Sequence, residues 1–157
     1  MKLVKKIIAL VLGVLMAFSF TGCIHKKGEI AVTIGDVEFT SAYYMCALIN
    51  SNTEAQNEVN SSLSEDELSS TTEIDYLSKE IDGKKFEDWV KDKAIENLKT
   101  IAAYKLLCKE NKLELTEEEA NNANMYASYY WSNYGYSAYF EPNGVSKATK
   151  TEYLKDT

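Results

Sequence analysis

The chain has 157 residues, a length that fits one domain, or one domain with a tail. It carries 24 acidic residues against 17 basic ones, for a formal net charge of −7. All the basic residues are lysine, and because an acidic chain without arginine lacks the usual phosphate clamps, we expect no nucleic-acid partner. The single histidine, His25, excludes a metal site built from several histidines. Three cysteines are too few for a disulfide scaffold.

The first 22 residues have the parts of an export signal. Lys2, Lys5 and Lys6 form a positive segment, and residues 7–20 are an almost unbroken apolar run of 14 residues. A transmembrane helix needs about 20 apolar residues, so this run is short for a bilayer span but has the size of a signal-peptide core. We therefore predict that residues 1–22 are a signal peptide.

A cysteine follows this signal directly. Residues 20–23, Phe-Thr-Gly-Cys, resemble the bacterial lipobox, although leucine usually stands where this chain has Phe20. The resemblance implies cleavage before Cys23 and a diacylglycerol on its thiol, with acyl chains such as palmitate that together give a stable membrane anchor. The alternatives are an ordinary signal peptide or an uncleaved anchor, and in both of them Cys23 is incidental.

Residues 23–29 form the predicted lipidated tether. The basic stretch His25, Lys26 and Lys27 suits contact with anionic headgroups, and we assign His25 to this tether rather than to a ligand or catalytic role. Loss of residues 1–22 removes three lysines, which leaves a formal net charge of −10.

A short β element opens the body of the chain. Apolar residues alternate along residues 30–39 on either side of Gly35 and Asp36, as in a strand with a turn. Thr40 or Ser41 then caps an amphipathic helix. Residues 50–72 are dominated by serine, asparagine, threonine and glutamate, and we interpret them as a mobile loop with one weak helical turn.

Residues 84–111 predict the clearest helix. Apolar residues recur there every three or four positions, and Phe86 and Trp89 are expected in the core. The preceding residues 73–81 form a short helix or an extended arm. Cys46 and Cys108 both fall on apolar helix faces, where cysteines usually serve as small hydrophobes. Export to an oxidising compartment leaves open that they pair.

A further helix begins after Thr116, which forms a capping box with Glu119. It leads into residues 126–140, which contain six tyrosines, one tryptophan and one phenylalanine. Rigid amphipathic rings suit contacts with unfolded peptides. The candidate client-binding residues are Tyr126, Tyr129, Tyr130, Trp131 and Tyr134. The alternative is that these rings pack against residues 84–111 or against a segment downstream of the given chain.

The last residues predict a turn and a helix. Residues 141–144, Glu-Pro-Asn-Gly, are typical of a turn, and Ser146 starts a helix that carries Tyr153 and Leu154. The sequence stops within this helical pattern at Thr157, so we expect the given chain to be cut short of a longer protein. Residues 30–157 are thus predicted to form one mostly α domain with one short β element near its N-terminus.

Four segments resemble, in order, the N-terminal domain of SurA/PrsA-type exported foldases. They are the strand and helix start at residues 34–40, the helix start at 83–94, the cap at 113–119 and the turn at 142–146. The resemblance implies a helical lobe that holds unfolded chains, joined in some members to a parvulin-type domain that catalyses prolyl isomerisation. A parvulin site uses paired histidines, and none follows His25. The chain as given is therefore not expected to be an isomerase.

The lipobox and the family resemblance together imply an exported lipoprotein. It would sit at the outer face of the cytoplasmic membrane, at the surface of a Gram-positive-type bacterium, with unfolded exported polypeptides as partners. One alternative is the N-terminal fragment of a peptidyl-prolyl cis-trans isomerase whose catalytic domain lies downstream. Another is a structural envelope lipoprotein that binds one specific partner. We predict no catalytic residue, no metal site and no cofactor for this chain.

Overall fold

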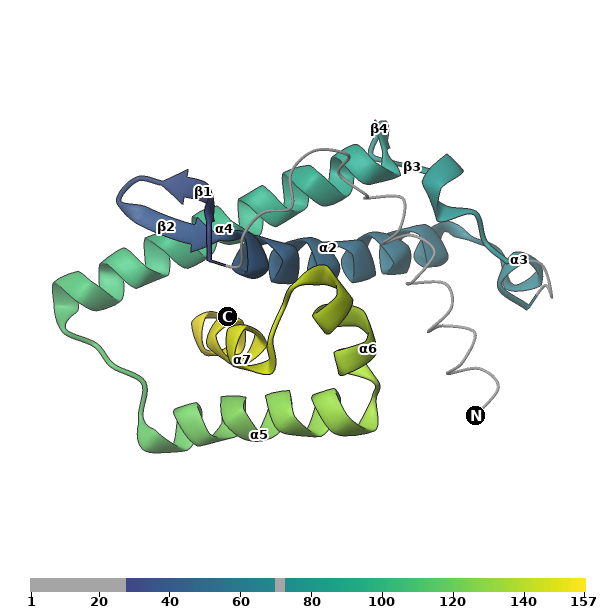
Figure 1. Ribbon diagram of the computed structural model, residues 1–157. Coiled ribbons are helices and arrows are strands. Elements are labelled where there is room, and N and C mark those ends of the chain that lie inside the picture. The colour runs from purple at the N-terminus through teal and green to yellow at the C-terminus, as the bar shows by residue number, and fades with distance from the viewer. Residues whose placement is uncertain (1–27, 70–72) are drawn as a thin grey trace.

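The computed structural model describes residues 28–69 and 73–157 (Figure 1). The predicted signal peptide, Cys23 and most of the tether lie outside these residues. The helices are α2 (Ser41–Ser62), α3 (Glu65–Ser69), α4 (Phe86–Asn111), α5 (Glu117–Asn133), α6 (Tyr136–Phe140) and α7 (Lys147–Asp156), and the strands are β1 (Ile30–Ile34), β2 (Val37–Thr40), β3 (Glu80–Ile81) and β4 (Lys84–Lys85). The prediction of a mostly α fold with a short β element near the N-terminus is confirmed.

The first β element is a hairpin that leads directly into α2. β1 and β2 pair antiparallel, with Ile34 opposite Val37. The turn between them places Gly35 at φ 58°, a left-handed conformation that glycine adopts without steric cost. Thr40 then caps α2, because its Oγ1 accepts a hydrogen bond from the backbone N–H of Tyr43 at 3.2 Å. The predicted strand, turn and helix cap are all present.

α2 is much longer than the sequence indicated. It continues to Ser62 and α3 follows it, so the interpretation of residues 50–72 as a loop is wrong over both helices. Ser51, Asn52, Ala55 and Val59 are all buried in the second half of α2. They are buried because α4 lies alongside α2, and this tertiary packing overrides the weak helical preference of the polar segment.

α4 supplies the other half of the core. Phe86, Val90, Ala94, Leu98 and Ile101 recur every three or four residues and are each at most 3 % exposed. Trp89 is partly buried and packs against this core. The predicted helix is therefore confirmed, and it ends at Asn111 as the sequence indicated.

The last turns of α4 are exposed, contrary to expectation. The sequence pattern placed Leu106 and Cys108 on the apolar face, but both are exposed. Figure 1 shows the reason, since α4 runs on past the start of α2 and leaves its main packing partner behind. Helical periodicity identifies a face, and a neighbouring element decides whether that face is buried.

A second, smaller hairpin was not predicted from the sequence. β3 and β4 pair antiparallel, and Asp82 and Gly83 between them have φ values of 53° and 75°. Two successive positive φ values are the signature of the tight turn that Asp-Gly favours. Just before the hairpin, a single 3₁₀ turn at Tyr76–Ser78 buries Tyr76, whose hydroxyl donates a hydrogen bond to Asn60 Oδ1 at 2.9 Å.

The remaining helices form a second layer below α2. In Figure 1, α7 lies between α2 and α5, and α5 packs mainly on α7 and α6. The capping box is confirmed: Thr116 Oγ1 accepts from the N–H of Glu119 at 3.3 Å, and the Glu119 carboxylate accepts from the N–H of Thr116 at 2.8 Å. Ser146 caps α7 in the same way, at 3.2 Å from the N–H of Thr149.

Candidate functional site

The end of α5 and the start of α6 carry a group of touching aromatic rings. We call this group the tyrosine cluster, and its members are Tyr126, Tyr129, Tyr130, Tyr134 and Tyr136. The ring centroids of contacting members lie 5.0–6.0 Å apart, within the range of favourable aromatic pairs. Each ring packs against another ring, and this contact limits the rotamers that it can adopt. The cluster therefore offers a broad surface that loses little side-chain entropy on binding.

Much of this cluster faces solvent. Tyr126, Tyr129 and Tyr134 are 54 %, 52 % and 49 % exposed, and Tyr130 is partly buried between them. A side-chain hydrogen bond with Tyr134 raises the pKa of Tyr129 above its ordinary value. Four of the five predicted client-binding residues therefore lie together at the surface.

Trp131, the fifth predicted residue, points elsewhere. Its ring stacks on Phe140 with centroids 5.9 Å apart, and it packs against the hydrophobic core. Phe140 itself is buried. Trp131 thus supports the cluster from behind rather than extending its open face.

A second apolar surface lies at the far end of α4, where the sequence analysis proposed none. We call it the α4-tip patch, and its members are Tyr104, Leu107, Leu113 and Leu115, which are 48–61 % exposed. The patch continues past the end of the helix, where Lys112 takes a left-handed conformation and the N–H of Leu113 bonds back to the carbonyl of Cys108 at 2.9 Å. The sequence signal for this patch is the pair of adjacent leucines, Leu106 and Leu107, near the end of a long helix. Two neighbouring residues cannot both lie on one narrow apolar helix face.

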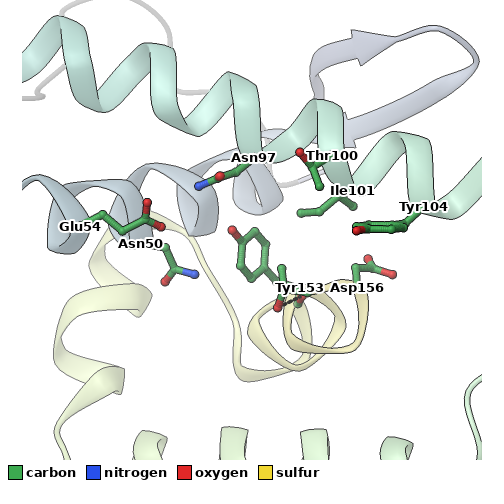
Figure 2. A pocket seen from close by; sticks show the side chains of 9 residues that line it. Asn50, Glu54, Asn97, Thr100, Ile101, Tyr104, Tyr153 and Asp156 are labelled. Carbon is green, nitrogen blue, oxygen red and sulfur yellow. Dashed lines mark hydrogen bonds between the residues drawn. The ribbon is translucent and has the colours of Figure 1, made fainter. Parts of the chain in front are cut away.

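A pocket of about 270 Å³ opens between α2, α4 and α7 (Figure 2). The side chain of Tyr153 stands near its centre, between residues of α2 and residues of α4. The lining residues are Asn50, Glu54, Asn97, Thr100, Ile101, Tyr104, Tyr153, Asp156 and Thr157. The pocket is small compared with the usual site for a drug-sized ligand, and it fits a single side chain or a short amine.

One wall of the pocket is fixed by a charged network. Asp156 Oδ2 accepts a hydrogen bond from the Tyr43 hydroxyl at 2.6 Å and pairs with Lys105 Nζ at 2.7 Å. Burial, together with this hydrogen bond to Asp156, holds the pKa of Tyr43 well above its ordinary value. The network joins α2, α4 and α7, so it sets the spacing of the three helices around the pocket.

A buried lysine lies behind the pocket. Lys150 is 4 % exposed, and its Nζ donates to Asn50 Oδ1 at 3.2 Å. The same Nζ lies 5.3 Å and 5.1 Å from the ring centroids of Phe140 and Tyr153. Burial lowers the pKa of Lys150, because none of these partners carries the full negative charge that would compensate a desolvated ammonium.

The cysteines within the described residues are free thiols in different surroundings. Cys46 is fully buried, and burial raises its pKa to about 12, which suppresses thiolate reactivity. Cys108 is exposed near the end of α4. The expectation that both lie on buried faces is therefore right for Cys46 and wrong for Cys108.

Two negative findings hold for residues 28–69 and 73–157. No cluster of three or more histidine, cysteine or acidic side chains there is arranged to hold a metal ion. None of the helices in this part of the chain is both long enough and apolar enough to cross a bilayer.

No family model, no curated protein and no solved structure matches the chain. Its function must therefore be argued from three features of its own surface: the tyrosine cluster, the α4-tip patch and the pocket between α2, α4 and α7.

Proposed function

We propose that the protein is an extracytoplasmic lipoprotein whose helical body holds unfolded polypeptides. The observation that carries this proposal is the exposure of the tyrosine cluster, most of which lies on α5, a helix that packs on α7 and α6. Exposed apolar groups on this scale are uncommon on a monomer without a binding role. The resemblance of several segments to SurA/PrsA-type foldases supports the same assignment.

The chemistry of the surface suits partners of varied sequence. Tyrosine buries a large apolar ring and keeps a hydroxyl that can satisfy a backbone N–H or carbonyl of an extended chain. The α4-tip patch adds aliphatic surface next to the segment that connects α4 to α5. Binding of this kind buries exposed apolar surface of the client and requires neither ATP nor a bond-making group.

The first experiment removes two rings of the tyrosine cluster. A Tyr126→Ser/Tyr129→Ser variant should lose most of its ability to suppress aggregation of a chemically denatured client, measured by light scattering during dilution from denaturant. Both side chains are more than half exposed, so the fold should survive and circular dichroism should be unchanged.

The matched control removes two exposed leucines elsewhere. Leu68 and Leu77 are 48 % and 37 % exposed and lie on α3 and the 3₁₀ turn, outside the tyrosine cluster. A Leu68→Ser/Leu77→Ser variant should suppress aggregation as well as the parent chain does. Equal losses in both variants would contradict a specific role for the tyrosine cluster, and no suppression by the parent would contradict the proposed function.

The membrane anchor is tested separately. Replacing Cys23 with serine should abolish incorporation of radiolabelled palmitate and release the protein from the membrane fraction, because the thiol is the predicted acylation site. Cys108→Ser is the control, since this exposed cysteine lies far outside the signal region and should leave labelling unchanged. Labelling that persists in the Cys23 variant would refute the lipobox interpretation.

A further inference from the structure

The pocket between α2, α4 and α7 offers several hydrogen-bond acceptors. Asn97 donates one Nδ2 hydrogen to Ser51 Oγ at 3.3 Å, and its carbonyl oxygen and second amide hydrogen can bond to a ligand. The hydroxyl of Thr100 donates its hydrogen bond to the carbonyl oxygen of Glu96 at 3.2 Å. A ligand that carries hydrogen-bond donors therefore finds oxygen lone pairs in this pocket.

The charges of the pocket favour the same kind of ligand. Glu54 and Asp156 lie on opposite sides of Tyr153 in Figure 2. Lys105 already compensates Asp156, whereas Glu54 has no ion pair with any lysine of the described chain. Lys150 lies behind the pocket wall, where Asn50 and two rings enclose it. The residues that line the pocket therefore contribute one carboxylate without an ion pair, that of Glu54, in a chain whose formal net charge is −7.

Two tyrosine rings complete the site. The buried ring of Tyr153 stands at the centre, and the ring of Tyr104, which is 59 % exposed, stands at the edge. Aromatic faces next to a carboxylate suit the aliphatic stem of a lysine or arginine side chain and attract its cationic head. The volume of about 270 Å³ matches one such side chain rather than a larger cofactor.

Tyr104 also links this pocket to the proposed client surface. It lines the pocket and belongs to the α4-tip patch, with Leu107 one turn further along α4. A polypeptide that lies along the patch would therefore have one side chain within reach of the pocket mouth. We propose that this pocket receives a lysine or arginine side chain of the bound polypeptide, a specificity that rests on the proposed function and gives the otherwise tolerant apolar surface a preference for basic segments.

The test compares four labelled peptides of identical apolar sequence that carry lysine, arginine, glutamine or glutamate at one central position. Fluorescence anisotropy should show the lysine and arginine peptides binding about tenfold more tightly than the glutamine peptide, as one charge-assisted contact predicts. The Glu54→Gln variant should lose this preference and keep the affinity for the glutamine peptide. Glu58→Gln on the same helix, exposed and outside the pocket lining, is the control and should keep the preference.

Each outcome decides a different point. No binding of any peptide contradicts the proposed function itself. Equal affinity for all four peptides overturns the pocket assignment and leaves the proposed function standing. Arginine amide serves as a free-amine probe. If it competes with the lysine and arginine peptides and not with the other two, the assignment is supported. If it binds tightly and leaves the affinity of every peptide unchanged, the pocket is a site for small amines and the polypeptide assignment is overturned.

Discussion

Replacing Leu98 with alanine is expected to lower the free energy of unfolding by about 2–5 kcal/mol, measured by urea denaturation. Leu98 is 0 % exposed in the middle of α4, where α2 packs against the helix. The substitution removes buried methyl groups and leaves a cavity that the surrounding side chains fill only in part. Because small domains are stable by about 5–15 kcal/mol, such a loss would leave the variant close to its unfolding limit.

The same helix offers a matched control. Leu107 is 51 % exposed, so Leu107→Ala should change the free energy of unfolding by no more than about 0.5 kcal/mol. Both variants exchange the same residue types within α4, so helix propensity cancels in the comparison. Equal losses at the two positions would show that the end of α4 is covered in solution, which would contradict the exposed α4-tip patch and remove half of the proposed client surface.

The features that the sequence predicted well are those that local chemistry decides. The capping box of Thr116 and Glu119 involves residues three positions apart, and the turn of the first hairpin depends on Gly35. The apolar repeat of α4 extends over enough turns to be unambiguous. In each case the information that fixes the structure lies within one short stretch of chain.

The predictions from the sequence were wrong where contacts between distant segments of the chain decide the structure. The second half of α2 has a polar composition, and it is helical because α4 covers residues such as Ala55 and Val59. Leu106 and Cys108 continue the periodic pattern but extend beyond their packing partner. Neither outcome follows from composition, since both depend on how far two helices overlap.

The candidate site shows the same division. The tyrosine cluster was visible in the sequence because its members lie within one segment, although the inward orientation of Trp131 was not. The pocket was not visible, since its lining comes from three helices and brings Asn50, Asn97 and Tyr153 together from positions up to about a hundred residues apart. Sequence reasoning found the surface on one helix and missed the cavity between helices.

Alkaline pH should destabilise the protein through side chains buried in their protonated forms. Burial raises the pKa of Cys46 from 9.0 to about 12 and that of Tyr153 from 10.0 to about 12, and the pKa of Tyr43 is also raised. Above pH 9 to 10 the unfolded chain loses these protons while the folded chain keeps them, so stability falls as pH rises. Lys150 acts in the opposite direction, because its lowered pKa makes the folded state bind fewer protons than the unfolded state below pH 10.5.

The balance favours destabilisation, because burial also raises the pKa of Tyr44, Tyr136 and Tyr139, and these groups act in the same direction as Cys46, Tyr43 and Tyr153. Each pKa unit corresponds to about 1.4 kcal/mol, so Cys46 and Tyr153 together should lower the free energy of unfolding by about 4 kcal/mol between pH 8 and pH 11, against which Lys150 acts. Urea denaturation measures the net loss. The Cys46→Ala variant should show a shallower decline, because it removes one of these titrating groups, whereas Cys108→Ala, at an exposed thiol, should follow the parent. Both variants need a reductant throughout. A stability that stays constant or rises up to pH 11 would mean that Lys150 dominates. A decline unchanged by Cys46→Ala would show that Cys46 is not one of the titrating groups.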